Sequence, residues 1–241
     1  KQIFKPQKKD FYHYPQFFSE EDVSMLLSEM KTLENDPNSK KPRAHDPLGR
    51  ANFLYIIHHK TELFKWLKDR IEPALPFKDV DYRYYSMNFY RLQIPYALHC
   101  DNLGEKEGFY QMIIPLSFDP VDTPPTTIIF DQTSSTYTEW ISPAFNKAPD
   151  YKPYRNKPIY DPNWYGGWSD EYWGKKWDEM YREGYKGFSI RKAYQWQVGD
   201  LFIFNSKFNH CASHLGDGLT RQKEGILVCL EKLSPESTSV Q

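Results

Sequence analysis

The chain has 241 residues, with 31 Lys and Arg against 32 Asp and Glu and a formal net charge of −1. This near-neutral balance, spread along the chain, gives no electrostatic attraction to nucleic acid or to an anionic membrane, so neither is expected as a partner. No apolar run reaches the length of a membrane-spanning helix, and no export signal is evident. Three scattered cysteines are too few for a disulfide framework and favour reduced thiols, hence a cytoplasmic location.

The N-terminal part, residues 1–78, is predicted to be mainly helical. The elements expected there are a strand-like arm (1–18, extended near Phe17 and Phe18), a helix (20–33), a polar loop (34–50), a short strand (53–57) and a helix capped by Thr61. Apolar residues recur at helical spacing in 20–33, and Ser19 with Asp22 is typical of a helix start.

Strands dominate from residue 79 onward, in keeping with the 17% aromatic content. They are expected at 80–93, 96–101, 109–118, 126–130, 188–197, 200–204 and 224–230. Residues 133–187 interrupt them with a polar, Trp-rich segment that is typical of an insertion, a lid or a binding loop. We therefore expect one α+β, mainly β domain, with 1–78 as helical support, 79–132 and 188–232 as the β core, and 133–187 as the insertion.

A histidine and a carboxylate stand two residues apart at His99 and Asp101. On an extended strand these positions project to the same side, so together they offer one nitrogen and one oxygen ligand to a metal. Cys100 between them would project to the other side. Such a pair arises by chance in many proteins, so a third ligand is needed to give it weight.

The third ligand is predicted at His210, which follows a buried strand that starts at Gly199-Asp200. Two histidines and one carboxylate on one side of a metal are characteristic of non-haem Fe(II) oxygenases. His214 is a rival for His210, but on a strand only one of the two would reach the metal. Arg221 lies eleven residues after His210, and its planar guanidinium, which stays charged, can form two hydrogen bonds to a carboxylate.

Together these pieces resemble the Fe(II)/2-oxoglutarate-dependent dioxygenases, in particular the prolyl-hydroxylase-like and phytanoyl-hydroxylase-like branches. The resemblance rests on His99-x-Asp101, the strand running from Gly199-Asp200 to His210, and Arg221, and it covers about 80–132 and 188–232. It implies a double-stranded β-helix (a jelly-roll, cupin-like core) with iron at its mouth. The implied cofactors are Fe(II), 2-oxoglutarate and O2, with ascorbate in support, and the implied reaction is a hydroxylation coupled to release of succinate and CO2.

Several points stay open at the level of sequence. Tyr90 is the candidate second contact to 2-oxoglutarate, because related enzymes often carry a Tyr shortly before the metal motif; a structural Tyr is the alternative. The substrate class is a small molecule or a peptide. The alternative functions are a cupin-type metalloenzyme that does not use 2-oxoglutarate, and a β-barrel module that binds a glycan or peptide and keeps a vestigial metal site.

Overall fold

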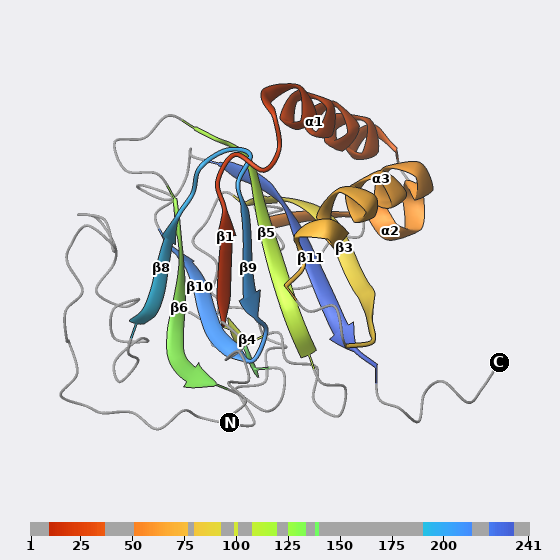
Figure 1. Cartoon of the computed structure of the whole chain (residues 1–241). Helices are drawn as coiled ribbons and strands as arrows, with labels where there is room; N and C mark the ends of the chain where they lie inside the picture. Colours follow the sequence, from red (N-terminus) through yellow and green to blue (C-terminus); the bar gives the residue numbers. More distant parts are fainter. Residues whose placement is uncertain are drawn as a thin grey trace, which may run out of the picture.

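Two antiparallel β-sheets form the body of the molecule, and helices cover the outer side of one of them (Figure 1). The computed structural model describes residues 10–36, 51–76, 80–92, 99–100, 108–119, 125–133, 138–139, 190–213 and 222–233. The strands are β1 (Phe11–Tyr14), β2 (Ala51–Tyr55), β3 (Tyr82–Leu92), β4 (His99–Cys100), β5 (Gly108–Phe118), β6 (Thr126–Thr133), β7 (Thr138–Glu139), β8 (Ile190–Gln195), β9 (Leu201–Asn205), β10 (Phe208–Ser213) and β11 (Lys223–Lys232). The helices are α1 (Glu20–Asn35), α2 (Ile56–His59), α3 (Thr61–Ile71) and a 3-10 helix, η1 (Glu72–Ala74).

The major sheet has the strand order β1-β9-β5-β11-β3-β2, and the minor sheet has the order β7-β4-β10-β6-β8. Strands that follow one another in the chain, such as β5 and β6 or β9 and β10, therefore lie in different sheets. Antiparallel strands that alternate between two sheets are the hallmark of a jelly roll. The predicted fold class, mainly β with a jelly-roll core and helices on the N-terminal side, is confirmed.

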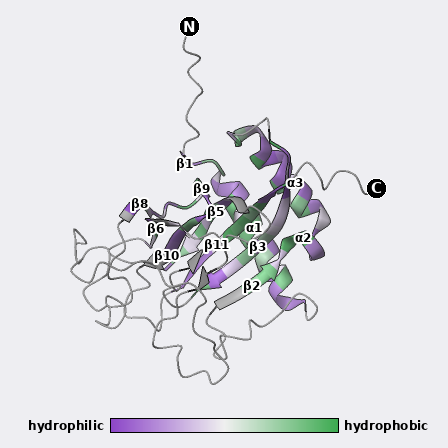
Figure 2. Ribbon diagram, turned by 90° about the horizontal axis from the view of Figure 1, so that it is seen from below, coloured by the Kyte–Doolittle hydropathy of each residue, from purple (hydrophilic) through white to green (hydrophobic). Residues whose placement is uncertain are grey.

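Residues alternate along β5 and β11 between two apolar cores. Even-numbered residues such as Met112 and Val228 face the helices, in what we call the outer core. The inner core lies between the two sheets, and odd-numbered residues such as Ile113 and Leu227 face it. Its members come from both sheets: Phe53, Tyr90, Leu92, Ile113, Ile129, Tyr194, Trp196, Phe202, Phe204 and Phe208. The minor sheet and the helices thus lie on opposite sides of the major sheet, as both views show (Figures 1 and 2).

Helix α1 confirms the predicted helix over 20–33 and runs two residues further. At its start the Ser19 hydroxyl accepts a hydrogen bond from the Asp22 amide at 3.2 Å, and the Asp22 carboxylate accepts one from the Ser19 amide at 3.0 Å. This reciprocal pair satisfies two amides that would otherwise lack partners. In α3, buried Leu63, Leu67 and Ile71 alternate with hydrophilic residues, which gives the banded colouring of that helix in Figure 2. No helix in the described ranges has the length and apolar character needed to cross a membrane.

Three local predictions were wrong in detail. The strand of the N-terminal arm lies at Phe11–Tyr14, where it pairs with β9, and not at Phe17 and Phe18. The strand predicted over 53–57 is Ala51–Tyr55, because Ile56 already begins a helix. Thr61 is the first residue of α3 and not its cap; Lys60 ends α2 and starts α3, so the chain passes directly from one helix to the next.

The predicted insertion, 133–187, lies mostly outside the described residues. Its described part includes β7, which pairs with β4 at the edge of the minor sheet. This short strand joins the start of the segment to the strand that carries His99.

Candidate metal and cosubstrate site

The backbone brings two of the three predicted metal ligands together. His99 on β4 and His210 on β10 are direct register partners in the minor sheet. Residues directly opposite on antiparallel strands share one side of the sheet, with Cβ atoms about 4.5–5.5 Å apart. Asp101 and Arg221 lie outside the described residues, as does the rival His214, and the side chain of His99 is not described. Among the side chains that are described, no three His, Cys, Asp or Glu residues gather in a metal-binding group.

The His210 side chain is buried, with 4% of its surface exposed. Its Nδ1 lies 3.0 Å from the carbonyl oxygen of Phe208. A carbonyl oxygen only accepts hydrogen bonds, so Nδ1 carries the proton and Nε2 of the neutral ring carries the lone pair. The ring also packs edge-on against Phe204, with 5.0 Å between centroids. The histidine is thus fixed in the tautomer that a metal ligand bound through Nε2 requires.

Two buried amide oxygens face the same inner space. Gln111 on β5 and Asn88 on β3 lie at inward positions and are 1% and 6% exposed. The side-chain carbonyl oxygen of each is buried, and no donor in the described part of the chain hydrogen-bonds to it. A buried acceptor without a donor carries a free-energy cost, which a polar ligand bound between the sheets would remove.

Lys223 is a buried cation that the sequence analysis did not single out. It lies at an inward position at the start of β11 and is 1% exposed. Its Nζ lies 4.3 Å from the ring centroid of Trp196, whose indole NH donates to the Thr127 hydroxyl at 2.9 Å. Because Trp196 and Thr127 belong to the minor-sheet side, the ammonium lies between the two sheets. The signal in the sequence was the spacing of Lys223 and Leu227, which are four residues apart and therefore face the same side of a mainly apolar strand.

Along the strand direction, Lys223 and His210 are offset by about two residues. Thr127 is two residues along β6 from Ile129, and Ile129 is the register partner of His210. Two residues of a strand span about 7 Å. The His210 imidazole therefore borders the inner space at one point, and the Lys223 ammonium and the Trp196 indole border it about 7 Å further along the strands.

Tyr90, the predicted cosubstrate contact, lies in the same inner core. It is stacked on Phe53 with 5.9 Å between centroids and lies edge-on to Trp196 at 6.0 Å. Its hydroxyl lies over Gly225, its register partner, where an added Cβ would come within 3.0 Å of the phenol oxygen. The pKa of Tyr90 is raised well above its usual value, mainly by burial and to a lesser extent by the nearby Tyr194. The phenol therefore stays neutral and able to donate a hydrogen bond.

The Gly199-Asp200 turn has a structural role at the other end of β9. Gly199 has φ +85°, and an added Cβ would lie 2.6 Å from the Phe18 carbonyl oxygen, so only glycine fits there. Asp200 is fully buried and accepts hydrogen bonds from the Gln16 amide at 2.9 Å and from the Tyr194 hydroxyl at 3.2 Å. The Nε2 of His13 lies 2.6 Å from the same carboxylate. Burial first, and the adjacent Asp200 second, raise the pKa of Tyr194.

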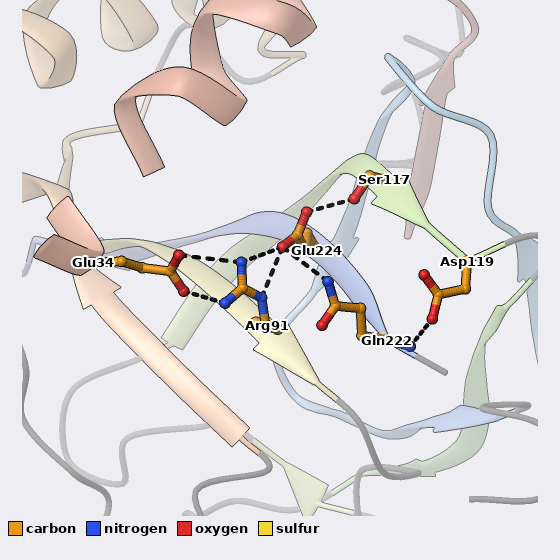
Figure 3. Close-up of polar contacts among 6 residues, drawn as sticks. All are labelled: Glu34, Arg91, Ser117, Asp119, Gln222 and Glu224. Carbon is orange, nitrogen blue, oxygen red and sulfur yellow. Dashed lines mark hydrogen bonds and ion pairs between the residues drawn. The ribbon is translucent and has the colours of Figure 1, made fainter. Parts of the chain in front are cut away.

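A polar network on the outer side of the major sheet holds the strand segments that carry Tyr90 and Lys223 (Figure 3). Arg91 on β3 donates to Glu224 on β11, with 2.8 Å between Nε and Oε1, and forms a two-point ion pair with Glu34 at the end of α1. Glu224 also accepts from the Ser117 hydroxyl at 2.6 Å. Because neighbouring residues on a strand face opposite sides, this network fixes the backbone whose inward residues line the inner space.

Comparison with known proteins gives a likeness at the level of structure. No family model matches the sequence, and no curated protein is significantly similar to it in sequence. The non-haem α-ketoglutarate-dependent carbocyclase SnoK of nogalamycin biosynthesis superimposes with a TM-score of 0.54 and 13% identity, over 92% of this chain and 79% of that one.

Two further solved structures give similar values. HygX from Streptomyces hygroscopicus, with nickel, 2-oxoglutarate and hygromycin B bound, has a TM-score of 0.52 and 15% identity, over 92% of this chain and 82% of that one. A prolyl-4-hydroxylase from Pseudomonas putida has a TM-score of 0.51 and 10% identity, over 93% of this chain and 94% of that one. The chain therefore has the jelly-roll fold of the 2-oxoglutarate- and Fe(II)-dependent oxygenases.

Proposed function

We propose that the protein is an Fe(II)- and 2-oxoglutarate-dependent oxygenase that hydroxylates a small molecule or a peptide. The observation that carries the proposal is the direct pairing of His99 with His210, together with a His210 ring whose Nε2 faces the inner space in the unprotonated form. The fold and the order of the motifs along the chain support the same assignment.

His99, Asp101 and His210 would hold the metal. The donor set of two imidazoles and one carboxylate fits Fe(II) and leaves positions open for a cosubstrate and O2. When bound, the iron supplies the oxidising power for the C–H bond, with 2-oxoglutarate converted to succinate and CO2 and with ascorbate as a supporting reductant.

Cationic and phenolic side chains would hold 2-oxoglutarate. Lys223 and the predicted Arg221 are both candidates for the carboxylate that is distant from the metal, and Tyr90 is the candidate for a further hydrogen bond. Lys223 and Tyr90 both contact Trp196. A buried cation stabilises a carboxylate more strongly than one in water, because less solvent screens the pair.

The chain itself would orient the substrate and exclude water. Phe204 packs against His210, and Phe202 and Phe208 are buried in the same inner core; none of the three side chains offers a polar group that would retain water. The specificity of substrate binding is proposed to come from the segment 133–187.

Anaerobic metal binding and succinate release test the proposal. The protein should bind Mn(II) or Fe(II), and with Fe(II), 2-oxoglutarate and ascorbate it should release succinate in a screen across substrate classes. Replacing His99, Asp101 or His210 by Ala should abolish both binding and release. His58→Ala is the matched control, since His58 is exposed on α2. Full metal affinity in His210→Ala would show that the ligand assignment is wrong.

A further inference from the structure

We propose that Gln111 is a positioning residue for the metal ligand His210. In the metal-free protein the Gln111 amide donates a hydrogen bond to Nε2 of His210. This hydrogen bond must break when a metal binds to the same nitrogen. This inference rests on the proposed function, because it takes His210 as a metal ligand.

Gln111 reaches His210 from the opposite sheet. It lies at an inward position in the middle of the major sheet, opposite Phe204 on β9 and Cys229 on β11. Its Nε2 lies 2.9 Å from Nε2 of His210, and both residues are buried. The hydrogen bond therefore crosses the inner space where a metal ligand would act.

The direction of this hydrogen bond follows from the other partner of the ring. Nδ1 of His210 lies 3.0 Å from the Phe208 carbonyl oxygen and must donate to it. Nε2 then accepts, and only the NH2 group of the Gln111 amide can donate to it. The amide oxygen of Gln111 is consequently turned elsewhere, and no donor among the described residues reaches it.

The amide and a metal compete for one lone pair. A metal–imidazole bond is about 2.0–2.1 Å long and uses the lone pair that now accepts from Gln111. The amide nitrogen at 2.9 Å occupies that direction, so the side chain must move when the metal arrives. Gln111 thus keeps the ring in the ligating tautomer and at the same time lowers the affinity for the metal by the strength of one hydrogen bond.

Gln111→Leu removes the competing amide and keeps the apolar stem. We expect its affinity for Mn(II), measured by anaerobic calorimetry without 2-oxoglutarate, to rise about 2- to 10-fold, the range that corresponds to one net hydrogen bond. Met112→Leu is the matched control, because Met112 is the next residue on β5 and faces the outer core; its affinity should equal that of the wild type. Gln111→Met is the second variant if the Leu variant unfolds.

Nitrogen NMR of the metal-free protein provides a readout that a purely structural role would not change. In the wild type, Nε2 of His210 should give the signal of an unprotonated, hydrogen-bonded nitrogen, and in Gln111→Leu this signal should shift to that of a nitrogen without a hydrogen bond. Equal or weaker Mn(II) binding by folded Gln111→Leu, or a protonated Nε2 in the wild type, would overturn the inference. Absence of Mn(II) binding by the wild type would instead overturn the proposed function, while the NMR measurement would still decide whether Gln111 holds Nε2.

Discussion

At the scale of single residues, the burial of Lys223 is the feature most closely tied to ligand chemistry. Its side chain is 1% exposed, and its ammonium lies over the Trp196 ring between the two sheets, where a bound carboxylate would be attracted to it with little screening by solvent. Lys223→Met should weaken binding of 2-oxoglutarate to the Ni(II)-loaded protein about 10- to 100-fold, the range for one charge-assisted hydrogen bond. Titration calorimetry of the wild type and the variant with 2-oxoglutarate measures the two affinities.

Two further variants make the measurement decisive. Lys232→Met removes an exposed lysine from the other end of β11 and should leave the affinity unchanged. Arg221→Met tests the other candidate cation. Unchanged binding in Lys223→Met together with a large loss in Arg221→Met would assign the carboxylate to the arginine.

At the scale of elements, Arg91 joins α1 to two strands of the major sheet. Its guanidinium lies between Glu34 and Glu224, and the side chain as a whole is 22% exposed. Arg91→Ala would leave two carboxylates facing each other without a cation. We expect a loss of about 2 kcal/mol in the free energy of unfolding, less than the roughly 3–5 kcal/mol for fully buried pairs, because solvent reaches part of the side chain.

Urea unfolding of Arg91→Ala and of a control measures that loss. Arg70→Ala is the control, since Arg70 also joins two elements, α3 and α1, through Asp22 at 3.3 Å, but is 49% exposed. Its loss should be about 0–1 kcal/mol. Equal losses in the two variants would contradict a special role for the network in Figure 3.

Local patterns in the sequence explain which elements could be predicted. Apolar spacing and the Ser19 cap predicted α1, and dense β-formers predicted most strands of the jelly roll, but not β7 or β10. The choice of strand partners could not be predicted, because the pairing of β1 with β9 depends on contacts between opposite ends of the described chain. Lys223 and Gln111 were missed for a related reason, since polar side chains are expected at the surface unless the fold buries them.

At the scale of the whole molecule, the abundance of buried tyrosines predicts sensitivity to alkaline pH. The pKa of Tyr110 is raised to about 12, mainly by burial and further by the nearby Tyr12 and Asp10. The pKa values of Tyr90 and Tyr194 are raised as well. In the unfolded chain these phenols ionise near pH 10. The unfolded state then binds fewer protons than the folded state, so stability is full below pH 10 and falls as the pH rises above it.

Urea unfolding at a series of pH values measures this slope. Each such tyrosine contributes about 1.4 kcal/mol per pH unit between its unfolded and folded pKa. Tyr110→Phe should therefore reduce the slope between pH 10 and about 12, whereas Met112→Leu, which removes no ionisable group from the same strand, should not. A flat profile through this range would contradict the expectation.

The contact between His13 and Asp200 joins residues 187 positions apart, and the bond between Gln111 and His210 joins residues 99 positions apart. A growing polypeptide therefore cannot close the sheets, or assemble the proposed metal site, until β9, β10 and β11 have been synthesised. Until then the apolar inward sides of β3, β5 and β6 have no cover. Topologies dominated by such distant pairings fold on timescales of roughly milliseconds to seconds, so the nascent protein should spend that interval as a substrate for chaperones.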